Sequence, residues 1–349
     1  FHDIEVGLRI HQDEEDRFQW EDKFKVENGR LRMTTAGIPG TQTNRITEAN
    51  AVSAHLLYKL TIHKLTLTPG LRYENVNLER RDFGTADIFR LGTNLNRRVN
   101  NIDQWIPGIG AHYKINPDFA FFGGVHKGFA PPGTTPNQDP EESTNYELGT
   151  RLNYRGFSAE VTGYYNDYSN LLGSDLAAAG GGSELDLFNA GSVDVRGVEL
   201  QLGYDLLQNN KRFKLPVILT YTFTDTEFNT SFDSEVFGSV QRGDEIPFIV
   251  KNQLNVVTRL ETAQWSFSFN TRYQGSYRNL AGSGSIPSNE KIPSAFVLDF
   301  SGRYRYNKNI DVHLNIINIF DNEYAVSRQP AGLRPGHPFG ISAGLAFHL

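Results

Sequence analysis

Residues 265–274 read Trp265-Ser266-Phe267-Ser268-Phe269-Asn270-Thr271-Arg272-Tyr273-Gln274, with aromatic side chains or threonine at odd positions and polar ones at even positions. Side chains on a β-strand point alternately to its two faces, so this segment predicts a strand with one apolar and one polar face. The same alternation recurs over residues 213–223, 296–306 and 310–320. The sequence therefore predicts an all-β fold.

About fifteen segments of this kind can be placed along the chain, near residues 1–10, 17–27, 47–60, 64–81, 103–115, 118–129, 143–154, 157–168, 187–206, 212–225, 247–260, 264–275, 293–305, 309–320 and 338–349. Many have about 10–15 residues, whereas a strand of a globular protein usually has ~5–6 and a tilted strand crossing a bilayer needs ~9–11. Their length therefore favours strands that cross a membrane.

The connections between these segments alternate strictly in length. The short ones cover residues 11–16, 61–63, 116–117, 155–156, 207–211, 261–263 and 306–308, and the long ones cover 28–46, 82–102, 130–142, 169–186, 226–246, 276–292 and 321–337. A soluble β-sandwich has short turns at both ends, which makes it the weaker alternative. The alternation predicts a transmembrane antiparallel up-and-down β-barrel with short periplasmic turns and long extracellular loops.

An odd number of strands is unusual for a bacterial outer-membrane barrel, which normally has an even number. An open sheet in lipid would also leave two unpaired edges. We therefore expect either that the chain is part of a larger barrel or that one strand has been missed.

Composition excludes several classes of protein. The 349 residues include 34 Lys and Arg against 40 Asp and Glu, which gives a formal net charge of −6 and argues against a nucleic-acid partner. There is no cysteine, so thiol nucleophiles, zinc ribbons and disulfide frameworks are excluded. No Ser, His and Asp arrangement has the context of a hydrolase, so no enzyme activity is expected.

Several motifs resemble those of TonB-dependent outer-membrane receptors along nearly the whole chain. They are Pro107-Gly108-Ile109-Gly110-Ala111, Asn116-Pro117-Asp118, Lys127-Gly128-Phe129-Ala130-Pro131-Pro132, Pro140-Glu141-Glu142-Ser143, Tyr146-Glu147-Leu148-Gly149, Arg196-Gly197-Val198-Glu199, Asn318-Ile319-Phe320-Asp321-Asn322-Glu323-Tyr324 and Arg334-Pro335-Gly336. Within this family, the opening Ile4-Glu5-Val6-Gly7-Leu8-Arg9, the run 14–22 and Thr43-Asn44-Arg45 look most like the ferric dicitrate receptor branch. One departure is the ending Phe347-His348-Leu349, where such barrels usually finish on an aromatic residue.

The resemblance implies a 22-stranded barrel closed by an N-terminal plug, of which residues 1–349 would be the C-terminal portion, without the plug and the first strands. It implies a location in the outer membrane of a Gram-negative bacterium and energised uptake of a ferric chelate, similar to ferric dicitrate, through binding in the extracellular loops. The implied partners are the chelate, the TonB–ExbB–ExbD complex through the missing N-terminal part, and outer-membrane lipid and lipopolysaccharide. No resident cofactor or metal is expected.

Capture of an anionic chelate calls for arginine, whose planar guanidinium pairs with carboxylates through two hydrogen bonds. Arg45 is the first candidate, because it follows a Gly- and Thr-rich loop where a strand re-enters the barrel. The pair Arg97-Arg98, placed in a polar loop, comes next, and Arg334 is a further loop arginine. Asn44 and Gln329 are expected to add neutral hydrogen bonds. Alternatively, loop arginines bind lipopolysaccharide phosphates or neighbouring carboxylates.

Other features support weaker interpretations. His337 is the histidine that a haem receptor would use, and a receptor for haem or another siderophore remains the main alternative, with a passive porin next. The acidic run 13–16 is expected in a solvated periplasmic turn, and Gly180-Gly181-Gly182-Ser183 in a flexible loop tip. Tyr164, Tyr165, Tyr168, Tyr273 and Tyr277 are expected in aromatic girdles at the membrane interfaces. A lumen network is expected from Glu147, Arg151, Glu199, Arg259, Arg272, Asp299, Arg303 and Arg305.

Overall fold

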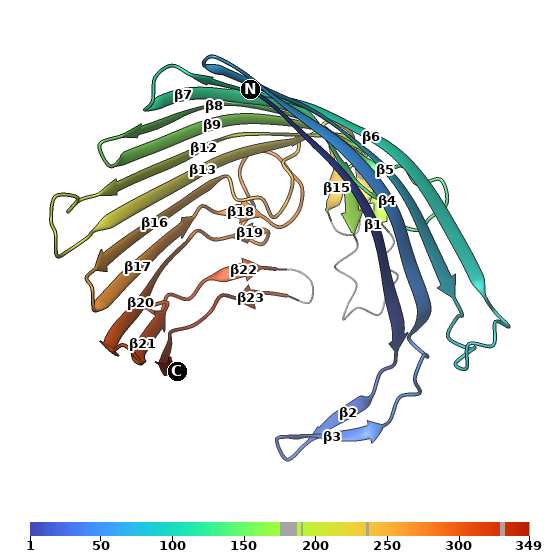
Figure 1. Ribbon diagram of the computed structural model, residues 1–349. Coiled ribbons are helices and arrows are strands. Elements are labelled where there is room, and N and C mark those ends of the chain that lie inside the picture. Colours follow the sequence, from blue (N-terminus) through green and yellow to red (C-terminus); the bar gives the residue numbers. More distant parts are fainter. Residues whose placement is uncertain (175–186, 190, 235–236, 329–331, 349) are drawn as a thin grey trace.

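The computed structural model describes residues 1–174, 187–189, 191–234, 237–328 and 332–348. Fourteen strands form one antiparallel sheet in which neighbours follow one another in chain order. The sheet curves through a wide arc, with the first strand at one edge and the last strand at the other (Figure 1). Within the described ranges, no helix has the length and apolar character needed to cross a membrane.

The strands of the sheet are β1 (His2–Gln19), β4 (Thr43–Ile62), β5 (Leu65–Asp82), β6 (Asn96–Lys114), β7 (Phe119–Ala130), β8 (Glu141–Tyr154), β9 (Phe157–Ser169), β12 (Val193–Asp205), β13 (Pro216–Phe228), β16 (Asn252–Glu261), β17 (Trp265–Gln274), β20 (Ala295–Asn307), β21 (Ile310–Ile317) and β24 (Gly340–Phe347). Among the described residues, five two-stranded hairpins lie in the long connections. They are β2 (Lys23–Glu27) with β3 (Arg30–Thr35), β10 (Leu172–Ser174) with β11 (Leu187–Asn189), β14 (Phe232–Ser234) with β15 (Gly238–Val240), β18 (Tyr277–Arg278) with β19 (Lys291–Ile292), and β22 (Ala325–Ser327) with β23 (Arg334–Pro335).

The all-β fold and the alternation of connections are confirmed. Tight turns join the strands at one end of the sheet, at residues 63–64, 115–118, 155–156, 262–264 and 308–309, together with the longer turn 206–215. The connections at the other end cover residues 20–42, 83–95, 131–140, 170–192, 229–251, 275–294 and 318–339. These two ends are called periplasmic and extracellular below, because short turns and long loops mark those sides in membrane barrels.

The turn predicted at residues 11–16, and with it the division between the first two predicted strands, is wrong. Strand β1 runs without a break through the acidic run and pairs with β4 along its whole length, from His2 opposite Leu60 to Gln19 opposite Thr43. The run 13–16 therefore lies toward the extracellular end of a strand and forms no periplasmic turn. All four side chains of this run are exposed, so their polarity does not interrupt the strand. The sheet accordingly has an even number of strands.

Outward-facing aromatic side chains gather at two levels of the sheet. Toward the periplasmic end, the Trp265 ring stacks on Phe267 with 4.8 Å between centroids. Toward the extracellular end, Tyr73 contacts Trp105 at 4.8 Å and Tyr146 contacts Tyr165 at 6.1 Å. Two aromatic levels flanking an apolar band are the arrangement of a membrane barrel, in which aromatic girdles lie at both interfaces.

The girdle prediction holds for only part of its residues. Tyr165 and Tyr273 are exposed outward-facing side chains, whereas the hydroxyl of Tyr164 lies 2.9 Å from Thr224 Oγ1 on the opposite face of the sheet. Consecutive residues of a strand point to opposite faces, so Tyr164 and Tyr165 cannot share a girdle. Tyr168 and Tyr277 instead pack in apolar clusters of the extracellular loops.

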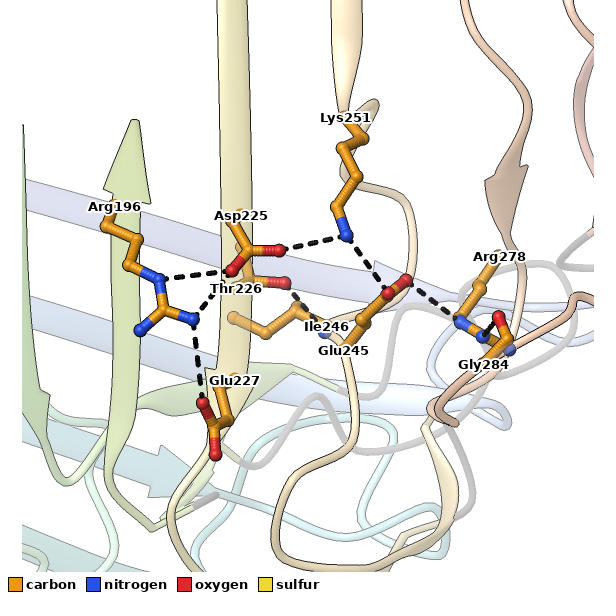
Figure 2. A network of polar contacts seen from close by, with 9 residues as sticks. All are labelled: Arg196, Asp225, Thr226, Glu227, Glu245, Ile246, Lys251, Arg278 and Gly284. Carbon is orange, nitrogen blue, oxygen red and sulfur yellow. Dashed lines mark hydrogen bonds and ion pairs between the residues drawn. The ribbon is translucent and has the colours of Figure 1, made fainter. Parts of the chain in front are cut away.

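Three long connections pack together at the extracellular end. Val193, Phe228 and Val240 are completely buried in one cluster, and Tyr277, Ile292 and Ala325 form a second. A polar network joins β12 and β13 to the first two of these connections: Asp225 binds Arg196 at 2.8 Å and Lys251 at 2.9 Å, and Glu245 binds Lys251 at 3.2 Å and Arg278 at 3.0 Å (Figure 2). The loops after β13, β17 and β21 are therefore held as one packed unit.

Candidate anion-binding site

Arginines from adjacent strands meet on the inner face near the extracellular end of β1, β4, β5 and β6. Arg17 lies directly opposite Arg45, and Arg45 lies opposite Asp82 on the next strand. Two residues below Asp82, Arg80 lies opposite Arg98 of β6. We call Arg17, Arg45 and Arg80 the arginine cluster. Cross-strand pairs of like charge destabilise a sheet, so this placement calls for an explanation beyond folding.

Arg45 is the member of the arginine cluster whose positive charge is least balanced by ion pairs and hydrogen bonds. Its side chain is only 5% exposed, and its buried Nε makes no hydrogen bond. Within the described residues, no ion pair joins Arg45 to an acid, whereas Arg17 lies 3.5 Å from Glu15 and Arg80 lies 3.2 Å from Asp82. A buried cation without a hydrogen-bonded partner is costly, and an incoming anion would remove that cost. This arrangement is suited to binding a carboxylate-rich or phosphate-rich ligand.

Asn44 and Arg45, predicted to act on the same ligand, are not brought together by the structure. Both residues lie inside β4 rather than in a loop, so their side chains leave opposite faces of the strand. The Asn44 amide is buried and donates hydrogen bonds to the carbonyls of Gly84 and Asp87, and its oxygen accepts one from Arg90 Nε at 2.8 Å. Asn44 therefore anchors the connection 83–95.

The pair Arg97-Arg98 is separated in the same way, because both residues belong to β6 and not to a loop. Arg97 faces outward and forms two hydrogen bonds of 2.8 Å with the carboxylate of Glu79. Arg98 faces inward, in register with Arg80. Only Arg98 is therefore placed near the arginine cluster. Arg97 pairs with a neighbouring carboxylate, which is the alternative role considered for these arginines.

The remaining candidates lie in the connection 318–339. Arg334 is exposed on β23, and no contact within the described residues joins it to the arginine cluster. His337 is exposed, and its Nδ1 lies 2.6 Å from the Pro338 carbonyl oxygen. Gln329 and the segment 180–183 lie outside the described residues.

The predicted lumen charges form separate short-range groups rather than one network, and in one of these groups Asp311 is shared by Arg303, Arg305 and His348. Arg272 binds Asp299 at 2.8 Å, Arg303 binds Asp311 at 2.6 Å, and Arg151 binds Glu160 at 2.6 Å. The described part of the chain holds no group of three or more His, Asp or Glu side chains suited to a metal ion.

The connection 83–95, which Asn44 anchors from the face of β4 opposite to Arg45, folds around one carboxylate. Asp87 accepts hydrogen bonds from the backbone amides of Leu91 (2.9 Å), Gly92 (2.7 Å) and Thr93 (3.2 Å). These amides, that of Leu91 first, hold the pKa of Asp87 below its ordinary value, although burial opposes them. From the same loop, Arg90 binds the carboxylate of Asp16 at 2.5 and 2.9 Å and so ties the loop to β1.

Asp87→Asn is expected to loosen residues 87–93, because a neutral amide accepts these hydrogen bonds more weakly than a carboxylate does. In the wild type, the stabilisation of this loop by ionised Asp87 is fully present above the ordinary pKa of ~3.9. It disappears as the pH falls through the lowered pKa that Asp87 has in the folded protein. Hydrogen exchange of amides 91–93, corrected for intrinsic rates, should therefore accelerate in the variant at neutral pH and in the wild type only in acid. Equal protection in both proteins at neutral pH would contradict the role of Asp87.

Comparison with known proteins agrees with this architecture. The family model described as "TonB dependent receptor-like, beta-barrel" matches residues 2–319. The metal-pseudopaline receptor CntO of Pseudomonas aeruginosa is 23% identical over 250 residues, which are 69% of this chain and 33% of that protein. The siderophore receptor PiuA from Acinetobacter baumannii has a crystal structure that superposes with a TM-score of 0.73 and 19% identity over 99% of this chain.

The ferric citrate transporter FecA in its unliganded form gives a TM-score of 0.71 at 17% identity. This chain spans about half of each solved structure, 52% of PiuA and 51% of FecA. These similar proteins are receptors and transporters rather than enzymes. Because the family model covers most of the sequence, the chain belongs to the TonB-dependent receptor β-barrel family.

Proposed function

We propose that this chain is the ligand-binding barrel portion of an outer-membrane receptor for an anionic ferric chelate, with a ferric citrate-like complex as the ligand. The observation that carries the proposal is the arginine cluster, in which the buried Nε of Arg45 has no hydrogen-bond partner beside Arg17 on the inner face. A chelate that presents several carboxylates would pair with these guanidinium groups and neutralise their mutual repulsion.

Related proteins support the proposed class of ligand, but they do not identify the ligand itself. FecA is described as a ferric citrate transporter, PiuA as a siderophore receptor and CntO as a metal-pseudopaline receptor. All three names refer to metal ions or their chelates. The cluster favours a carboxylate-bearing chelate over haem, because His337 lies in a different connection and its ring nitrogen contacts a carbonyl oxygen.

We further propose that residues 1–349 are the C-terminal part of a 22-stranded barrel with a plug, driven by TonB–ExbB–ExbD in the outer membrane of a Gram-negative bacterium. The chain's coverage of about half of its solved relatives supports this. Within the described residues, β1 and β24 each pair on one side only, which leaves two sheet edges for further strands. An intact mass near twice that of this chain, measured on protein extracted from native membranes, is expected. A mass equal to that of this chain would refute the proposal that it is part of a larger receptor.

Ligand choice is tested by measuring binding of ferric citrate, a ferric catecholate and haem to the full-length receptor in detergent. Ferric citrate is expected to bind most tightly, with an affinity that falls as salt is added, because attraction between exposed charges is screened. Uptake of radiolabelled iron citrate by iron-starved cells should require both this protein and TonB. Preferential binding of haem would favour the alternative receptor, and TonB-independent passage would indicate a passive porin.

A further inference from the structure

The outward face between β6 and β13 carries a hollow of about 890 Å³. Two cross-strand rows of outward-facing residues line it. The row nearer the periplasmic end consists of Ala111, Gly123, Leu148, Gly163, Val198 and Phe223, and the row nearer the extracellular end of Ile109, Val125, Tyr146, Tyr165, Arg196 and Asp225. The volume lies within the ~300–1,000 Å³ typical of ligand pockets.

Missing side chains create this hollow. Gly123 and Gly163 have none, and both lie in register with Leu148, one on each side. Leu148 is 71% exposed, so it stands as a ridge between two furrows. The sheet surface is therefore grooved at a height where neighbouring strands present larger apolar residues such as Val198 and Phe223.

The height of the hollow on the sheet indicates whether it faces lipid or water. Its upper limit is the contact between Tyr146 and Tyr165, which belongs to the extracellular aromatic level. Beside that contact, the half-exposed guanidinium of Arg196 binds Asp225 at 2.8 Å, which marks the polar boundary. Below this boundary the lining is apolar, so the hollow opens into the outer half of the hydrocarbon layer.

We propose that the hollow binds an acyl chain of an outer-leaflet lipid, with the headgroup at the level of Tyr165 and Arg196. This rests on the outer-membrane location proposed above. Narrow furrows on both sides of Leu148 accommodate a thin, flexible hydrocarbon chain. A second copy of this barrel would approach with a convex face, and the Leu148 ridge would keep that face from the floors of both furrows.

Gly163→Leu is the variant that fills a furrow. A Cβ at Gly163 would meet its nearest neighbour, the Leu148 carbonyl oxygen, at an ordinary 3.9 Å, so the backbone can stay in place. Gly123 is unsuitable, because a Cβ there would lie 2.9 Å from the Glu147 carbonyl oxygen. Ala343→Leu is the matched control, since Ala343 is exposed on β24 and lies outside the hollow.

The test is native mass spectrometry of the full-length receptor, titrated in detergent with dimyristoyl phosphatidylglycerol. Leucine at position 163 excludes about two lipid methylene groups, so the apparent affinity for the first bound lipid should fall about tenfold, while the control variant matches the wild type. Unchanged lipid occupancy in Gly163→Leu would overturn the proposal. So would the loss of a dimer without a change in bound lipid, because the hollow would then be a contact between two copies.

The two proposals fail separately. Lipid occupancy is measured without any chelate, so a receptor that does not bind ferric citrate can still show the effect of Gly163→Leu. A protein absent from the outer-membrane fraction would refute the shared assumption of location.

Discussion

Arg45→Ala should weaken binding of ferric citrate to the full-length receptor by about 10- to 100-fold. A hydrogen bond to a charged group contributes ~1.5–3 kcal/mol, and the buried Nε of Arg45 makes no hydrogen bond that would have to be released before it binds the ligand. Arg45→Lys should recover part of the loss, because it keeps the charge without the planar pair of donors. Isothermal titration with the purified receptor measures all three affinities.

Arg97→Ala is the matched control for this prediction. Arg97 comes from the same end of the sheet but faces outward, where it already pairs with Glu79. Its loss should leave the affinity unchanged. Arg45→Ala should also leave thermal stability equal or slightly higher, because it relieves repulsion from Arg17. An unchanged affinity in Arg45→Ala, or equal losses in both variants, would exclude the arginine cluster as the binding site.

Arg278→Met should release the packed extracellular loops. Arg278 is only 3% exposed, and it binds Glu245 at 3.0 Å and the Gly284 carbonyl oxygen at 2.5 Å (Figure 2). Removing one partner of a buried ion pair typically costs ~3–5 kcal/mol, because the other charge loses its compensation. Lys251 still contacts Glu245, so we expect the lower end of that range. Local opening of residues 237–251 and 275–294 should then become about 100-fold more frequent.

Hydrogen exchange of peptides from these two loops measures the effect. Arg196→Met is the matched control in the same network, because the Arg196 side chain is half-exposed and such pairs contribute only ~0–1 kcal/mol. Protection of the periplasmic turns should be the same in both variants. Equal protection of the loops in Arg278→Met and the wild type would show that the apolar clusters alone hold the loops together.

The sequence was sufficient to predict which residues share a face and which end of the sheet carries long loops. Strand alternation arises from local backbone geometry, so Trp265 to Gln274 reads as a strand without knowledge of its neighbours. Placing each candidate site residue requires the ends of the strands. These ends cannot be read from the sequence, because the strands continue into polar segments that look like loops. Asn44, Arg45, Arg97 and Arg98 were assigned to loops, yet the strands continue beyond the membrane and include all four.

The tertiary structure alone determined which charges meet. Arg17 and Arg45 are 28 positions apart, and only the register of β1 against β4 brings them together. Register depends on contacts between distant segments, and a shift of one residue would exchange Arg45 for Asn44 on the inner face. The sequence by itself therefore determined the all-β membrane architecture and the abundance of arginine near its extracellular end. Strand pairing decided which arginine is left buried without an ion pair, because that property belongs to neighbouring strands rather than to any one segment.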